Sequence, residues 1–548
     1  MDAREYAKFL TLKDPAWEGG DTRKQGGTIM RTETFRFKGF GRLSAGLVLA
    51  LGLATGPAAL AQEAKKGGTL TVAIETDMEG FDAVESGAAG ITDQTVMKTV
   101  MEPLMTWNHE TNEPGPLLAT EWSPNEDQTV WTVKLRDDVK FHDGSPFTAT
   151  DVAHHYNRVL DPANKSRSRS YISVIEHVDA IDDTTVEFHL KHPWAALLPY
   201  LASTGYSGMI PSHKQVEAGK QQREPIGTGP YRLVEWRSGD RLVMEKNQDY
   251  WAKDEINVDK IVFRQLPDTQ TRFASLQSGQ VDVIWTDRGP TILEAQTDPN
   301  IVTLIAEGGG AATVMLNGKE GMVLANDNLR FALAHAWNQA AVTKISWQDT
   351  RPNVEHPLGN VDCSAFDMHY RAFDIDKAKD YLAKYKEETG KDNVTLTMIH
   401  TATARGRELG EIYQQTARAA GIELELVPVD QTTLVKRTYG SDFDITGWRI
   451  SDGADLGPQL FSYTQPGSSY NLTGFDDPEL TQLGEEMRVA TSLRERHDLQ
   501  CKMAARMNER ARILYRGGGR YYAFTRPNIK NVPEPFSGVT DVTRAWIE

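Results

Sequence analysis

Cysteine is scarce in this chain of 548 residues, which contains only Cys363 and Cys501. No Cys-x-x-Cys pair and no Cys/His group with zinc spacing is present, so the sequence predicts no metal site and no cofactor. His154 and His155 are adjacent on an expected helix and therefore point in different directions. Two cysteines can pair in an oxidising compartment, and two separate buried thiols are the open alternative. We expect a disulfide.

Basic residues are also fewer than acidic residues. Lys and Arg total 60 against 76 Asp and Glu, which gives a formal net charge of −16. An acidic chain without a basic cluster is a poor binder of nucleic acid. The hydrophobic content of 39% and charged content of 25% are typical of a globular protein, and the length predicts two or three domains.

No apolar run is long enough to make a confident membrane span. The longest, Ala45–Ala54, is short and rich in glycine; it follows Arg42 and precedes Ala59-Leu60-Ala61. This order is typical of a secretory signal cleaved before Gln62, and we expect translation to start at Met30. With no cysteine near the cleavage point, we expect a periplasmic protein without a lipid anchor.

The common catalytic loops are missing. Gly205–Met209 is one residue short of a nucleophile elbow, and Gly227–Pro230 lacks the helix and third glycine of a dinucleotide loop. Gly308–Gly310 and Gly517–Gly519 lack the Lys and Ser/Thr of a phosphate loop, and we interpret them as chain breaks or hinges. We predict no catalytic residue, although paired carboxylates of a glycosidase carry no local motif and remain open.

The periodicity of apolar residues changes along the chain. Up to about residue 300 the pattern predicts mostly strands, with a few helices such as one opened by a capping box at Thr148 and Asp151. From about 326 helical faces dominate, and 394–448 reads as strand–helix–strand–helix–strand. That order indicates a parallel α/β sheet. The region 477–512 is expected to be helical and is followed by another strand.

Polar side chains gather where the last strand of that pattern is expected to end. Phe443–Trp448 reads as a buried strand, and Arg449, Asp452 and Asp455 follow it. Ligands of open α/β sheets collect beyond the carboxyl ends of the strands, so Trp448 and these three residues are candidates for ligand contact. A polar turn without function is the alternative.

Five stretches resemble the solute-binding proteins of bacterial ABC importers, in the peptide/nickel class known as family 5. They follow one another in the order of that family and are Leu117–Val152, Pro225–Trp251, Thr271–Val283, Asn326–Gln339 and Asn471–Leu483. The likeness extends from about Gly67 to the C-terminus.

The resemblance implies an α/β fold of two lobes that close on a solute like a hinged clamp (type II). The first lobe would hold 62–312 and 515–548, with a subdomain at about 105–225, and the second would hold 313–514. The changes in pattern near 311–326 and after 514 agree with these boundaries.

The resemblance also implies roles for particular residues. In peptide-binding members an Asp just after a Gly-Trp strand end meets the amino group of the ligand, and Asp452 occupies that place here. The spacing from Trp448 is one residue longer than usual, so Asp455 is the reserve, and we expect Arg449 to hold it. Arg407, or else Arg405, matches the arginine that holds the ligand carboxylate.

The function implied is that of a monomeric periplasmic protein that captures a small peptide and delivers it to an inner-membrane ABC permease. Such a protein is not an enzyme. The same fold also binds sugars, opines and metal chelates, and a periplasmic hydrolase is the alternative from another class.

Overall fold

The computed structural model describes residues 64–86, 90–108, 113–194, 196–203, 205, 208–359, 361–451, 455–468, 470–490 and 492–548. The expected leader, its cleavage before Gln62 and its start at Met30 lie outside these residues, and so does Asp452. Within the described part of the chain, no helix is both long enough and apolar enough to cross a membrane.

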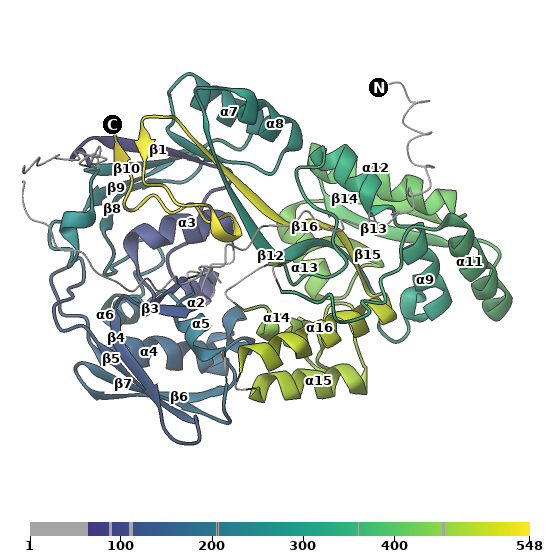
Figure 1. The fold of residues 1–548 in the computed structure, drawn as a ribbon, viewed down its shortest axis with the longest axis horizontal. Coiled ribbons are helices and arrows are strands. Elements are labelled where there is room, and N and C mark those ends of the chain that lie inside the picture. Colours follow the sequence, from purple (N-terminus) through teal and green to yellow (C-terminus); the bar gives the residue numbers. More distant parts are fainter. Residues whose placement is uncertain are drawn as a thin grey trace, which may run out of the picture. The chain divides into compact units, whose positions relative to one another are not determined.

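A sheet of ten strands connects distant parts of the sequence (Figure 1), in the order β14-β13-β15-β12-β16-β11-β1-β10-β9-β8. We call the part around β1 and β8 to β11 the first lobe and the part around β13 to β15 the second lobe. The strands are β1 (Thr69–Ile74), β8 (Tyr231–Arg237), β9 (Arg241–Lys246), β10 (Lys260–Gln265), β11 (Val283–Trp285), β12 (Val302–Leu316), β13 (Thr395–Thr401), β14 (Glu423–Val429), β15 (Ile445–Ser451) and β16 (Ile513–Thr525).

Two long antiparallel strands, β12 and β16, join the two lobes. At one end of the pair, Thr525 lies opposite both Val302 of β12 and Val283 of β11. At the other end, Ile513 lies opposite Met315, and β12 pairs on its second side with β15. The boundaries expected from the sequence, 312/313 and 514/515, fall within these two strands.

The glycine triplets are not chain breaks, because both lie inside these continuous strands. Gly308 is opposite Gly519, and the register shifts before Ala311, which is opposite Gly518. A Cβ at Gly518 would lie 2.6 Å from Cγ1 of Val354, so this glycine lets the crossing strands pack closely against a neighbouring segment. The prediction of breaks was wrong, because a glycine in a strand can serve close packing.

The second lobe has the predicted strand–helix–strand–helix–strand order. Strand β13 pairs in parallel with both β14 and β15, and helices α12 and α13 connect them. Helix α9 buries Leu329 and Leu333 against this sheet, as its spacing predicts. The helices of the lobe are α9 (Asp327–Ala336), α10 (Gln339–Val342), α11 (Ile375–Thr389), α12 (Ala404–Ala419), α13 (Gln431–Tyr439), α14 (Gly457–Thr464), α15 (Pro478–Val489) and α16 (Leu493–Arg510).

The two cysteines form a disulfide within the second lobe, which confirms the expected pairing. Cys501 lies on α16 and Cys363 in the segment before α11, 138 residues away, with Cα atoms 5.5 Å apart. Both are buried in the core that α14, α15 and α16 form with β15.

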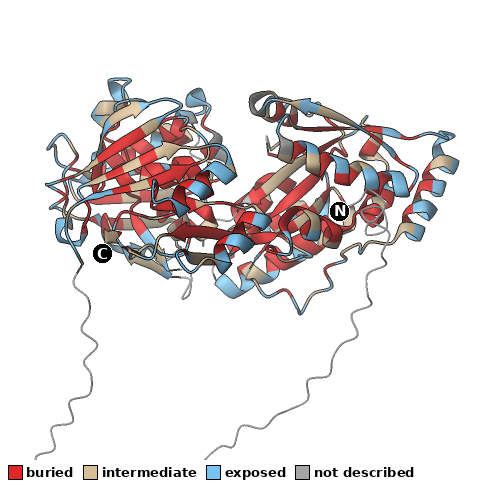
Figure 2. Cartoon of the chain, turned by 90° about the horizontal axis from the view of Figure 1, so that it is seen from above, coloured by how far each residue is buried: buried red, intermediate tan, exposed pale blue. Residues whose placement is uncertain are grey.

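The first lobe contains its own helices and a subdomain with a separate core. The subdomain sheet has the order β4-β5-β7-β6, and α4 covers it with the capping box of Thr148 and Asp151 in place. Buried positions follow the strands and the inner faces of the helices (Figure 2). The remaining elements are α2 (Ala83–Ser86), α3 (Ile91–Val100), β2 (Met105–Asn108), β3 (Glu113–Pro116), β4 (Ala119–Pro124), β5 (Val130–Leu135), α4 (Ala149–Leu160), β6 (Ile175–Asp182), β7 (Thr185–Leu190), α5 (Leu197–Leu201), α6 (His213–Glu217), α7 (Thr269–Gln277), α8 (Gly289–Thr297), β17 (Ile529–Lys530) and β18 (Trp546–Ile547).

Candidate functional site

A cavity of about 300 Å³ is lined by residues of both lobes. The second lobe contributes Arg449, Asp455 and Gln459, from the end of β15 and the start of α14. The first lobe contributes the rest of the wall from α3, the segments around β2 and α5, and the segment that follows β17. These residues include Gln94, Lys98, Thr106, Trp107, Tyr200, Glu534 and Asp541. A solute in this cavity would touch both lobes.

An ion pair forms part of the first-lobe wall. Nζ of Lys98 lies 2.7 Å from Oδ2 of Asp541, and the hydroxyl of Thr543 donates a hydrogen bond to Oδ1 of the same carboxylate at 2.6 Å. Burial acts to raise the pKa of Asp541, but Lys98 and Thr543 outweigh it and lower the pKa to about 2. Asp541 is therefore ionised at neutral pH.

Strand β15 continues further than the sequence predicts. It ends at Ser451 rather than Trp448, because its last residues pair with β12 beyond the end of β13. Trp448 and Arg449 are therefore strand residues, paired with Thr313 and Ala312 of β12. Nε1 of Trp448 donates to the hydroxyl of Tyr463 at 3.1 Å, and the edge-on ring of Tyr439 lies 6.0 Å away.

Asp455 lines the cavity, and its carboxylate is bound from behind by the second lobe. Arg496 of α16 forms an ion pair with it, Gln500 donates to Oδ1 at 2.8 Å, and the Gly457 backbone donates at 2.6 Å. The Arg496 side chain is 1% exposed and that of Asp455 is 7% exposed. From the sequence we expected Arg449 to be the partner of Asp455. That expectation did not include Arg496, which lies 41 residues after Asp455 in the chain.

The predicted arginines of α12 lie outside the residues that line this cavity. Arg405, at the start of the helix, donates to the backbone oxygen of Ser346 at 3.1 Å and lies over the ring of Trp347, 5.1 Å from its centroid. Arg407 is exposed on the same helix. The sequence ranked Arg407 ahead of Arg405, whereas in the structure Arg405 makes these contacts and Arg407 is exposed.

Arg405 belongs to a concentration of positive charge at the crossing strands. Burial acts to raise the pKa of Asp287, but nearby arginines outweigh it and lower the pKa; in order of effect they are Arg351, Arg405, Arg288 and Arg516. We call Asp287 and these four arginines the arginine group. It gathers residues of the first lobe, the second lobe and β16.

Trp347 lies among three of these arginines. Arg351 and Arg516 have their guanidinium carbons 5.2 and 6.0 Å from its ring centroid, in addition to Arg405. Among the described residues, the buried Nε1 of Trp347 and Nε of Arg516 have no hydrogen-bond partner. Buried donors are normally satisfied, so unpaired donors beside excess positive charge suit an anionic group of a bound solute.

One contact connects the arginine group with the cavity. Nη2 of Arg516 donates to the backbone oxygen of Trp448 at 3.0 Å, and the next residue, Arg449, lines the cavity. The three residues between Ser451 and Asp455 include Asp452 and lie outside the described part of the chain.

Residues 113–471 match the family described as bacterial extracellular solute-binding proteins, family 5 Middle. The chain belongs to this family. The glutathione-binding protein GsiB of Pectobacterium atrosepticum is 27% identical to it over 429 residues, which are 76% of this chain and 81% of the relative. The dipeptide-binding protein DppE of Bacillus subtilis is 25% identical over 424 residues, or 71% and 75% of the two chains.

A solved structure supports the fold expected of this family 5 chain. The periplasmic binding protein DppA of Helicobacter pylori, solved in complex with the peptide STSA, superposes with a TM-score of 0.79 at 22% identity. The match covers 88% of this chain and 99% of that one. The chain has the α/β fold of type II periplasmic binding proteins, with two lobes and the additional subdomain in the first.

Three residues of the candidate site in this family 5 protein were not found from the sequence. Lys98 of the cavity wall and Arg351 and Arg516 of the arginine group stand in no recognisable motif, and they come from different parts of the chain. Arg516 had one available signal, because it directly precedes the triplet Gly517–Gly519 that marked a crossing. For the other two residues the sequence offered no comparable signal.

Proposed function

We propose that this protein captures a short peptide between its lobes and delivers it to an inner-membrane ABC permease. The observation that carries the proposal is the cavity lined by both lobes, with Arg449 and Asp455 on one wall and the arginine group connected to it through Trp448. The relatives named for glutathione and dipeptide binding support a peptide as the solute.

The two charged ends of a peptide have separate partners in this proposal. Asp452 receives the α-amino group, because Asp455 is already bound by Arg496 and Gln500. The arginine group receives the carboxylate, since its four guanidinium groups outnumber the two acids beside them, Asp287 and Glu408. The ring of Trp448 borders the amino end and adds a cation–π contribution of about 0.5–2 kcal/mol.

Closure of the lobes is the working step of the proposed function. We propose 62–312 and 515–548 as the first lobe, 313–514 as the second, and the register shift after Gly308 as the place where β12 and β16 bend. The solute favours the closed form because only that form lets it contact both lobes. The protein would be exported after cleavage before Gln62 and act in the periplasm as a monomer that catalyses no reaction.

Mass spectrometry under native conditions tests the proposal most directly. We expect protein freshly purified from the periplasm to carry a ligand of peptide mass and to begin at Gln62. After removal of that ligand, calorimetry with dipeptides, tripeptides and glutathione should show binding with a stoichiometry of one. A bound sugar, or no binding of any peptide, would contradict the peptide assignment, and release of cleaved products would indicate a hydrolase.

The arginine group also accommodates other carboxylate-bearing solutes. An opine or a metal chelate carries several carboxylates, and four arginines beside two acids, Asp287 and Glu408, would suit them. Competition between a bound peptide and such compounds in the same calorimeter separates these possibilities. The peptide remains our first choice because of the free-amine partner that Asp452 would provide.

A further inference from the structure

Four side chains of types that can bind metal ions share one face of the subdomain sheet, and none of them lines the cavity. His177 and Asp179 lie on β6, and Glu187 and His189 lie on β7. In the antiparallel register His177 is opposite His189 and Asp179 is opposite Glu187, so the four positions form the corners of a square. Residues two apart on a strand point to the same face, which brings both imidazoles and both carboxylates together.

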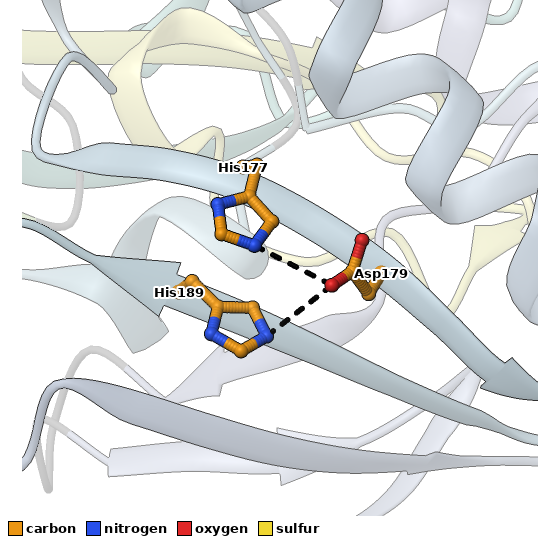
Figure 3. Close-up of side chains that lie close together, drawn as sticks. All are labelled: His177, Asp179 and His189. Atoms are coloured by element: carbon orange, nitrogen blue, oxygen red, sulfur yellow. Dashed lines mark ion pairs between the residues drawn. The ribbon is translucent and has the colours of Figure 1, made fainter.

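The ligand atoms converge on one point, as Figure 3 shows for three of the residues. Oδ2 of Asp179 lies 3.4 Å from Nε2 of His177 and 3.5 Å from Nε2 of His189. The two imidazole rings are parallel, with centroids 4.3 Å apart. One ligand atom from each of these three residues lies within 4.8 Å of the other two.

These separations are close to those within a zinc coordination sphere. With bond lengths of about 2.0–2.1 Å, two ligand atoms of a tetrahedral zinc site lie about 3.3 Å apart. A small movement of the side chains would therefore admit an ion between the three atoms. No backbone change is needed, because residues 177–180 of β6 pair regularly between two register shifts.

A second observation concerns the ring nitrogen of His189 that faces Asp179. Its Nε2 atom is buried and has no hydrogen-bond partner among the described residues. Oε2 of Glu187 lies 3.6 Å from that nitrogen, and the hydroxyl of Thr132 donates to the other oxygen of Glu187 at 3.3 Å. Thr132 thereby holds Glu187 where it can supply a fourth ligand.

We propose that His177, Asp179 and His189 bind a divalent transition-metal ion, with Glu187 or water as the fourth ligand. Two imidazoles and a carboxylate suit Zn²⁺, and related ions such as Ni²⁺ and Cu²⁺ accept the same donors. The ion would be coordinated from both strands of the hairpin, β6 and β7. None of the four residues lines the solute cavity. The sequence did not reveal the site, because the pairs His-x-Asp and Glu-x-His converge only through the strand register.

Zinc calorimetry on the mature, tag-free and solute-free protein tests the proposal. The variant is the double substitution His177→Gln and His189→Gln. The matched control is His369→Gln, because His369 also lies between two carboxylates, each 3.5 Å away, and has 45% side-chain exposure against 46% for His177. We expect one zinc site in the parent and the control, with at least about tenfold weaker binding in the double variant.

Two further readouts make the result decisive. Co²⁺ bound to the parent should show the visible absorption of a tetrahedral site, and this absorption should be absent in the double variant. Thermal melting without metal should show that the double variant is folded. Saturation with a peptide solute should leave the zinc affinity unchanged. Absence of zinc binding in the parent, or equal binding in the double variant, would overturn the proposal.

Discussion

Asp452 and Asp455 stand three residues apart in the sequence, and we expect them to have different roles. Asp455 is already bound by Arg496, so our proposal assigns the ligand amine to Asp452. We predict that Asp452→Asn weakens binding of a free-amine peptide at least about tenfold, or 1.4 kcal/mol, because the amide no longer carries the charge that attracts the amine. Calorimetry measures the loss.

The control for this prediction changes the ligand instead of the protein. N-acetylation of the peptide should weaken binding to the parent by a similar factor, and the two losses should not add, because both remove the same interaction. Asp498→Asn, at an exposed position on α16, should have no effect. Equal binding of acetylated and free peptide would show that Asp452 is not the amine partner.

Arg405 and Arg407 provide a matched pair on one helix. Arg405 lies in the arginine group beside Trp347, whereas Arg407 is exposed. Arg405→Gln should weaken peptide binding at least about tenfold, since one partner of the carboxylate is lost, and Arg407→Gln should leave it nearly unchanged. C-terminal amidation of the peptide should abolish the difference. A larger loss in Arg407→Gln would reverse the assignment.

At the scale of the element, α16 holds Asp455 just before the start of α14. Arg496 is almost fully buried and paired with Asp455, and its Nη1 also donates to the backbone of Met487 at 2.6 Å. Removing one partner of a buried ion pair typically costs about 3–5 kcal/mol, because the remaining charge stays buried and unpaired. We therefore predict that Arg496→Met lowers the free energy of unfolding by about that amount, as measured with urea.

An exposed arginine supplies the comparison. Arg418 pairs with Glu423 at 3.3 Å, and both side chains are mostly exposed. Arg418→Met should change the free energy of unfolding by less than about 1 kcal/mol. Adding Asp455→Asn to Arg496→Met should recover part of the loss. If Arg496→Met and Arg418→Met have equal effects, the buried pair of Arg496 with Asp455 does not contribute the predicted stability.

The elements themselves could largely be predicted from the sequence, because each depends on local periodicity. The parallel order of β13, β14 and β15 and the capping box at Thr148 are examples. The end of β15 could not be predicted, since its last residues are fixed by pairing with β12, which is distant in sequence. The pairing of Arg496 with Asp455 and the gathering of the arginine group depend on contacts between elements for the same reason.

At the scale of the whole molecule, the crossing strands should permit closure around a solute. We predict that a cognate peptide reduces the radius of gyration measured by X-ray scattering, because the lobes come together on it. At a solute concentration one hundred times the dissociation constant, the stabilisation should be about 2.7 kcal/mol, visible as a higher melting temperature.

A ligand that binds more weakly is the control for this measurement. N-acetylated peptide at the same concentration, if its dissociation constant is tenfold higher, should stabilise the protein by only about 1.4 kcal/mol and so raise the melting temperature less than the free peptide does. Tight binding of the free peptide with an unchanged radius would contradict the clamp mechanism while leaving the solute assignment intact.

The pairing of β12 with β16 has a consequence for how such a protein can diversify. Thr313 and Tyr515, at the boundaries that we propose for the second lobe, lie opposite each other in the ladder. With these boundaries the second lobe is a continuous insert with adjacent ends, and the disulfide between Cys363 and Cys501 lies wholly within it. A lobe of this kind can be exchanged between homologues as a cassette at two neighbouring junctions. Recombination there would give the molecule a new half-site for solute while leaving its other half intact.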